Sequence, residues 1–103
     1  MKTEVSILHH EYPAGAREFV QSKLQNVAKY FSRTHSVRAV LEKQHDTHRV
    51  ELVAQIPRGQ VVVIDARAST FGQAVDEAVD RLSRNLAKYK DKLTSRTRRA
   101  TKE

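Results

Sequence analysis

The residues best suited to chemistry in this chain are the Lys and Arg of its C-terminal end, because together they could bind phosphate. From Arg81 to Glu103 the sequence has nine Lys or Arg and two acids, which accounts for the whole formal net charge of +7. The first 80 residues carry ten basic and ten acidic side chains and are neutral. A basic lobe on a neutral body favours a polyanionic partner, and nucleic acid, whose binding releases counterions, is the commonest one.

Four of these cations share one side of the last expected helix: Arg81, Arg84, Lys88 and Lys92. At 100° per residue they fall within about 80° of one another, roughly 120° from the apolar stripe of that helix. A charged helix face is often merely solvated, but like charges at i,i+4 cost stability, which favours a functional reason for them. We interpret these four residues as a basic ridge that contacts RNA or DNA. Lys23 or Arg17 of the first expected helix could join it if the two helices lie side by side.

Other chemistries have weaker support. The pairs His9-His10 and His45-x-x-His48 are the only hint of a metal site, and a histidine-only zinc site usually needs a third ligand. The three glycines are isolated, so no phosphate-binding loop is present, and there is no cysteine for a disulfide or thiolate site. We therefore expect no metal, no cofactor, no small-molecule substrate and no enzymatic activity.

Length and composition limit the class of protein. A chain of 103 residues is expected to form one domain, long enough to bury a core without disulfides. No segment approaches the roughly 18 apolar residues of a membrane span, and the N-terminal residues lack the apolar stretch of a signal peptide. These features predict a soluble, cytoplasmic protein with no membrane partner.

The elements that would position the ridge follow from hydrophobic periodicity. Alternating and helical patterns predict, in chain order, a strand at 3–9, a helix at 14–31, strands at 37–43, 47–56 and 61–68, and a helix at 70–93. Thr70 and Gln73 have the spacing of a capping box, although Ser69 is an alternative cap. Phe31 is expected in the core. For Tyr30 the sequence allows two roles, packing in the core or stacking on a nucleic-acid base.

This element order predicts an α+β fold. The first β–α–β unit implies a parallel strand pair, and the short loops that follow imply an antiparallel meander. The result is a βαβββα two-layer sandwich, a four-stranded mixed sheet with both helices on one face. Residues 1–93 would form this domain, and residues 94–103, which have no apolar side chain larger than Ala, would form a disordered basic tail.

Three stretches of sequence also carry a resemblance to a known family: residues 17–31, the segment from Thr47-His48 to Gly59, and residues 74–93. From Val5 to Leu93 the chain resembles the short ribosome hibernation-promoting factors and ribosome-associated translation inhibitors, also called sigma-54 modulation proteins. The third stretch is the most specific, because it fixes apolar and basic positions over nearly the whole last helix. The family often has Asp-Met-Tyr where this chain has Thr70-Phe71-Gly72, so any role of that tyrosine is lost here.

The resemblance implies a fold similar to double-stranded-RNA-binding domains. It also implies that the protein binds the small ribosomal subunit and its rRNA in the channel used by mRNA and tRNA, and inhibits translation under stress or in stationary phase. The residues that it assigns to rRNA phosphates are Lys23, Arg81, Arg84, Lys88 and Lys92. Two alternatives stay open at this point: a general double-stranded-RNA or DNA binder, and a regulator that acts through protein contacts.

Overall fold

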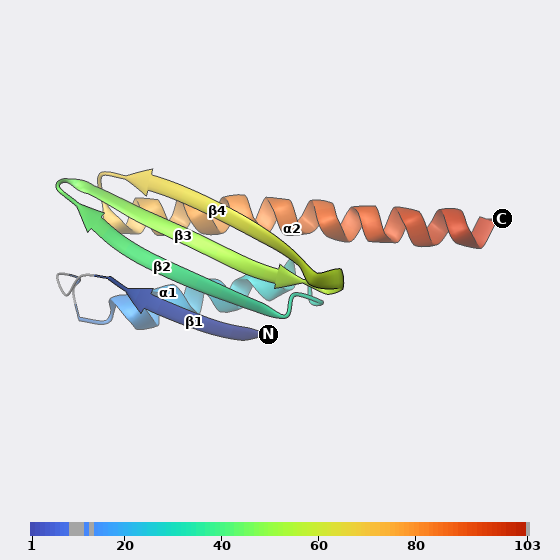
Figure 1. Ribbon diagram of the computed structural model, residues 1–103, viewed down its shortest axis with the longest axis horizontal. Helices are drawn as coiled ribbons and strands as arrows, with labels where there is room; N and C mark the ends of the chain where they lie inside the picture. The colour runs from blue at the N-terminus through green and yellow to red at the C-terminus, as the bar shows by residue number, and fades with distance from the viewer. Residues whose placement is uncertain (9–11, 13, 103) are drawn as a thin grey trace.

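The chain folds into two layers, a sheet and a pair of helices (Figure 1). The structure is a computed structural model that describes residues 1–8, 12 and 14–102, with side chains through Lys92 apart from that of Ala28. Its elements are β1 (Lys2–Ile7), α1 (Ala16–Gln25), the 3₁₀ turn η1 (Asn26–Lys29), β2 (Ser36–Gln44), β3 (Thr47–Ile56), the 3₁₀ turn η2 (Pro57–Gly59), β4 (Gln60–Ala68) and α2 (Phe71–Lys102).

The four strands lie in the order β1-β2-β3-β4. β1 pairs with β2 in parallel, whereas the β2–β3 and β3–β4 pairs are antiparallel. This mixed sheet confirms the expected crossover followed by a meander. Both helices lie against the same face, as expected, and the opposite face of the sheet is left open (Figure 1).

The core lies between the inner face of the sheet and the apolar stripes of the helices. Alternate residues of the strands point into it, so Leu41 and Leu52 are fully buried while their chain neighbours are partly exposed. From α2, Val75, Leu82 and Leu86 belong to the same core cluster and have no exposed surface. Phe31 is also buried, which confirms the expectation, whereas Tyr30 is 48% exposed.

The ends of the helices differ from those expected. α1 gives way at Gln25 to the tighter turn η1, which ends at Lys29 rather than continuing to residue 31. α2 continues to Lys102, beyond the expected end at 93, and extends past the end of the sheet (Figure 1). After Gly72 the sequence contains neither Gly nor Pro, so no residue forces the helix to stop. The backbone at 94–102 is thus helical, while the division into a domain at 1–93 and a separate tail stays a prediction.

We expect truncation after Leu93 to leave the thermal midpoint within a few degrees of that of the full chain. The removed segment has no apolar side chain larger than Ala, so it has little to contribute to the core. About 1 kcal/mol shifts the midpoint of a domain of this size by only several degrees. A drop near 10 °C in a thermal melt followed by circular dichroism would show instead that the segment docks on the body.

The start of α2 yields a second prediction. The backbone amide of Gln73 donates a hydrogen bond to Thr70 Oγ1 over 3.3 Å, so Thr70 rather than Ser69 caps the helix. Thr70→Ala should destabilise the protein by about 0.5–2 kcal/mol, because it leaves an amide at the helix start without its acceptor. Denaturant unfolding measures the loss, and Ser69→Ala is the matched control. Equal losses in the two variants would show that the hydroxyl of Thr70 is not the cap.

Candidate nucleic-acid interface

The four ridge residues lie where the helical pattern predicts. All four side chains, Arg81, Arg84, Lys88 and Lys92, are exposed on α2. Between them, Leu82 and Leu86 point the other way and are fully buried. Burial of the apolar stripe therefore fixes which side of α2 the cations present to solvent.

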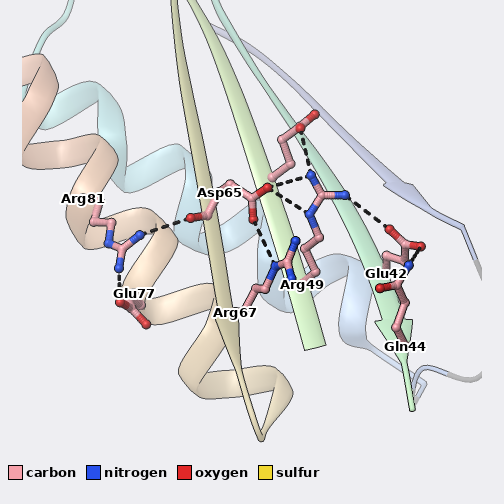
Figure 2. A network of polar contacts seen from close by, with 8 residues as sticks. Glu42, Gln44, Arg49, Asp65, Arg67, Glu77 and Arg81 are labelled. Atoms are coloured by element: carbon pink, nitrogen blue, oxygen red, sulfur yellow. Dashed lines mark hydrogen bonds and ion pairs between the residues drawn. The ribbon is translucent and has the colours of Figure 1, made fainter. Parts of the chain in front are cut away.

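The first two cations of the ridge already have acidic partners. Arg81 pairs with Glu77 one turn earlier and also donates a hydrogen bond of 3.1 Å to the backbone carbonyl of Asp65 in β4 (Figure 2). Arg84 pairs with Asp80, and the hydrogen bond to that carboxylate raises the pKa of the guanidinium. These contacts orient both guanidinium groups, and because the groups are exposed each pair contributes little to stability.

The last two cations of the ridge have no such partner. No ion pair or hydrogen bond joins Lys88 or Lys92 to another side chain in the described part of the protein. Lys92 Nζ lies 5.9 Å from the centroid of the Tyr89 ring, a cation–π arrangement. Both ammonium groups are thus available to an external anion.

Lys23 lies apart from the ridge. It comes from α1 and forms an ion pair of 3.2 Å with Asp76 on α2, while its ammonium sits 5.5 Å from the centroid of the Phe19 ring. It lines a hollow of about 270 Å³ between the helices, together with Tyr30 and Asp80. Arg81 by contrast reaches toward β4, so the structure brings the four α2 cations together and sets Lys23 across the helix from Arg81.

Arg17, the other candidate from the first helix, does not join the ridge. Its guanidinium donates a hydrogen bond to the backbone carbonyl of Val5 in β1, which ties α1 to an edge of the sheet. This contact has a structural role.

The open face of the sheet carries a network of charges centred on Arg49 in β3 (Figure 2). Its guanidinium lies 2.6 Å from Asp65 and 3.5 Å from both Glu42 and Glu51. The hydrogen bond from Arg49 lowers the pKa of Asp65 from its ordinary value of 3.8, against the opposing effect of desolvation. Arg67 adds a more distant contact to Asp65 at 4.0 Å. The pair of Arg49 in β3 with Asp65 in β4 is thus a cross-strand ion pair on the open face.

The histidines in the described part of the chain do not form a metal site. His48 packs among the rings of Tyr12 and Phe71, with centroids 5.8 and 6.4 Å away. Burial, and to a smaller extent Glu42, raises the pKa of Tyr12. Within residues 1–8, 12 and 14–102 no group of three His, Asp or Glu could hold a metal ion. His9 and His10 lie outside the described residues.

Sequence reasoning missed the cations at the end of the sheet where β3 turns into β4. Arg58 lies in that turn and Lys92 lines the same small hollow beside it. Lys2 and Arg38 line a larger hollow at the same end of the sheet. Lys92 is already a predicted ridge residue, but the signal for Lys2, Arg38 and Arg58 is weak, because they are isolated cations within residues 1–80, which are neutral in total.

Taken together, the structure is a small βαβββα fold with a row of exposed cations along α2. None of its helices, over the described residues, is long and apolar enough to cross a bilayer. The model of the protein family described as "Sigma 54 modulation protein / S30EA ribosomal protein" matches residues 3–94. The chain belongs to this family.

Individual relatives agree with this assignment. The chain is 32% identical over 95 residues to the ribosome hibernation promoting factor of Pseudomonas putida, covering 92% of each chain. It is 34% identical over 87 residues to the factor of the same name from Escherichia coli K12, covering 81% of this chain and 86% of the relative.

Two solved structures share the fold. The N-terminal domain of Thermus thermophilus Protein Y superposes with a TM-score of 0.75 at 23% identity, covering 86% of this chain and 99% of that domain. A ribosomal subunit interface protein from Coxiella burnetii superposes with a TM-score of 0.78 at 18% identity, covering 88% and 99%. These likenesses confirm the predicted fold class.

The network on the open face predicts a pH-dependent stability. Because the folded-state pKa of Asp65 lies below its ordinary value of 3.8, its pairing with Arg49 stabilises the fold at neutral pH, and this contribution is lost as the pH falls through the folded-state pKa. We expect Asp65→Asn to lower the thermal midpoint slightly at pH 7. The difference from the unmodified protein should shrink steadily below pH 3.8.

Asp46→Asn, in the exposed turn between β2 and β3, is the matched control and should leave the midpoint unchanged. Thermal melts of the three proteins between pH 2.5 and 7 test the prediction. A difference between Asp65→Asn and the unmodified protein that stayed constant over this range would contradict it.

Proposed function

We propose that this protein is a ribosome hibernation factor. In this proposal it binds the small ribosomal subunit in the channel used by mRNA and tRNA, through contacts to rRNA, and inhibits translation under stress or in stationary phase. Its role is binding rather than catalysis, and its site of action is the cytoplasm. The observation that carries the proposal is the exposed ridge of Arg81, Arg84, Lys88 and Lys92 in a chain that belongs to this family.

Three physical features support rRNA as the partner. The ridge cations are spaced along one exposed helix face, which suits the regular phosphates of a nucleic-acid backbone. Lys88 and Lys92 have no acidic partner among the described side chains, so binding costs them no existing ion pair. Arg81 and Arg84 do have such partners, but exposed pairs contribute little, so exchange of a carboxylate for a phosphate is cheap.

The curated relatives support the ribosome as the assembly that is bound. The factors from Pseudomonas putida and Escherichia coli are both named for promoting ribosome hibernation, and the matches cover most of their length. We extend this role to the present chain. Lys23, at the groove between α1 and α2, would contribute at the margin of the surface, since Asp76 competes for its ammonium.

Charge reversal on the ridge tests the proposal. Arg84→Glu combined with Lys88→Glu should preserve the fold, because both side chains are exposed and lie off the apolar stripe. Binding to purified small subunits should weaken by at least about tenfold, and inhibition of a cell-free translation reaction should be relieved in parallel. Each lost phosphate contact should also flatten the log–log salt dependence of binding by roughly 0.7 to 0.9 units.

Two further proteins serve as controls in the same assays. Arg84→Lys combined with Lys88→Arg keeps the charges and should bind nearly as well as the unmodified protein. Deletion of residues 94–103 should weaken binding only modestly.

If the deletion abolished binding while the double Glu protein bound normally, a nonspecific attraction by the terminal cations would replace the channel model. Equal affinity for free duplex RNA would favour a general RNA-binding module, and no cosedimentation with ribosomes would favour a regulator that acts through protein contacts.

A further inference from the structure

Two sets of cations in the described part of the protein differ in whether a carboxylate pairs with them. Those toward the start of α2 and on the open face beside it have carboxylate partners, as in the pairs Arg49–Asp65, Arg81–Glu77 and Arg84–Asp80. Those at the end of the sheet that carries the β3–β4 turn do not. This second group, which we call the turn-end cations, consists of Lys2, Arg38, Arg58 and Lys92.

A chain of three adjoining hollows connects the turn-end cations. The first, of about 430 Å³, lies where β1 and β2 begin and is lined by Lys2, Arg38 and Gln55. The second, of about 270 Å³, shares Gln55 with it and is also lined by Gln60. The third, of about 50 Å³, shares Gln60 with the second and is lined by Tyr89 and Lys92 of α2. The hollows therefore lead from the open face of the sheet, around the β3–β4 turn, to the basic ridge.

Positive charge predominates along this path. The residues that line the three hollows include four cations and one acid, Glu4. No ion pair joins Lys2, Arg38 or Arg58 to an acid in the described part of the protein, although Glu4 lies opposite Arg38 in the strand register. Unpaired cations beside neutral hydrogen-bonding side chains such as Gln55 and Gln60 suit a ligand that offers phosphate oxygens and polar edges together.

Arg58 adds an observation from the backbone. It has a φ of +69° and a ψ of +27°, the left-handed conformation, as does the neighbouring Gly59. A glycine would adopt this conformation at lower cost than an arginine. Strained residues of this kind concentrate at functional sites. His45, in the β2–β3 turn, also has a positive φ, but of these two residues only Arg58 is a turn-end cation.

We infer that the turn-end cations form a second RNA-binding surface, continuous with the ridge through Lys92, over which a phosphodiester backbone runs from α2 around the β3–β4 turn onto the open face of the sheet. The inference rests on the proposed function and extends it to residues off the two helices. Arg58 and Lys92 bind phosphate at the turn, and Lys2 and Arg38 bind the backbone farther along. The partner class is RNA, not an acidic protein segment.

The first test separates binding from folding. Arg58→Gly removes the charge and relieves the left-handed strain, so the thermal midpoint should stay the same or rise. Affinity for purified small subunits should fall by about threefold to tenfold, and the salt dependence should flatten by roughly 0.7 to 0.9 units if one phosphate contact is lost. Arg58→Lys keeps the charge and should retain most of the affinity. Arg67→Gly, on the same strand pair but at the opposite end of the sheet, should leave the affinity unchanged.

The second test identifies what lies against the turn. The chain has no cysteine, so Gln60→Cys or Asp46→Cys each allows one photo-crosslinker to be attached at a single site. On small subunits, the label at position 60 should capture rRNA, whereas the label at position 46, in the opposite turn, should capture much less. Capture of a ribosomal protein at position 60 would overturn RNA as the partner of this surface.

The outcomes also separate this inference from the proposed function. Suppose that Arg58→Gly bound like the unmodified protein and the label at position 60 captured nothing, while the Arg84/Lys88 double Glu protein lost binding. The inference of a second surface would then be wrong, and the proposed role of the ridge would be supported. If the unmodified protein did not bind small subunits, both the proposed function and the inference of a second surface would be contradicted.

Discussion

The contact between the apolar stripe of α2 and the inner face of the sheet is the constraint on which the rest of this structure depends. Full burial of a leucine or valine side chain contributes about 1.5–3 kcal/mol, and α2 buries Val75, Leu82 and Leu86 completely. Repulsion between like charges one turn apart on a helix costs only about 0.2–0.5 kcal/mol per pair. Because burial contributes more than the repulsion costs, packing sets the rotation of α2 about its axis. The ridge cations are exposed together as a consequence of that rotation.

The ion pairs of the surface orient side chains more than they hold the fold. Glu77 and Asp80 fix the directions of Arg81 and Arg84, and Arg81 is also anchored by the carbonyl of Asp65. A phosphate oxygen and a carboxylate oxygen are similar acceptors for a guanidinium, so an RNA backbone could replace these acids at small cost. The arrangement orients the first two cations of the ridge, Arg81 and Arg84, in the free protein and leaves the last two, Lys88 and Lys92, without an ion pair among the described side chains.

Much of the fold could be predicted from the sequence because its signals are local. Alternation fixed β3 at residues 47–56, and the helical period fixed the buried stripe of α2 and hence the exposed side that carries Arg84 and Lys88. Spacing offered Thr70 as the helix cap with Ser69 as the alternative, and the hydrogen bond from the Gln73 amide identifies Thr70. The predicted end of α2 at residue 93 was wrong, because the helix continues to Lys102. A basic segment without Gly or Pro has no local signal that ends a helix.

Tertiary structure decided how charges from distant parts of the sequence meet. The sequence determines that residues 1–80 are neutral in total, but strand pairing decides which cations form ion pairs. Arg49 pairs with three acids, whereas Arg38 and Arg58 form no ion pair in the described part of the protein. Packing of α1 against α2 set Lys23 beside Asp76, away from Arg81. Periodicity along a helix or strand predicts which face a residue occupies. Which residues of other elements lie beside it depends on strand register and packing, and no local pattern encodes these.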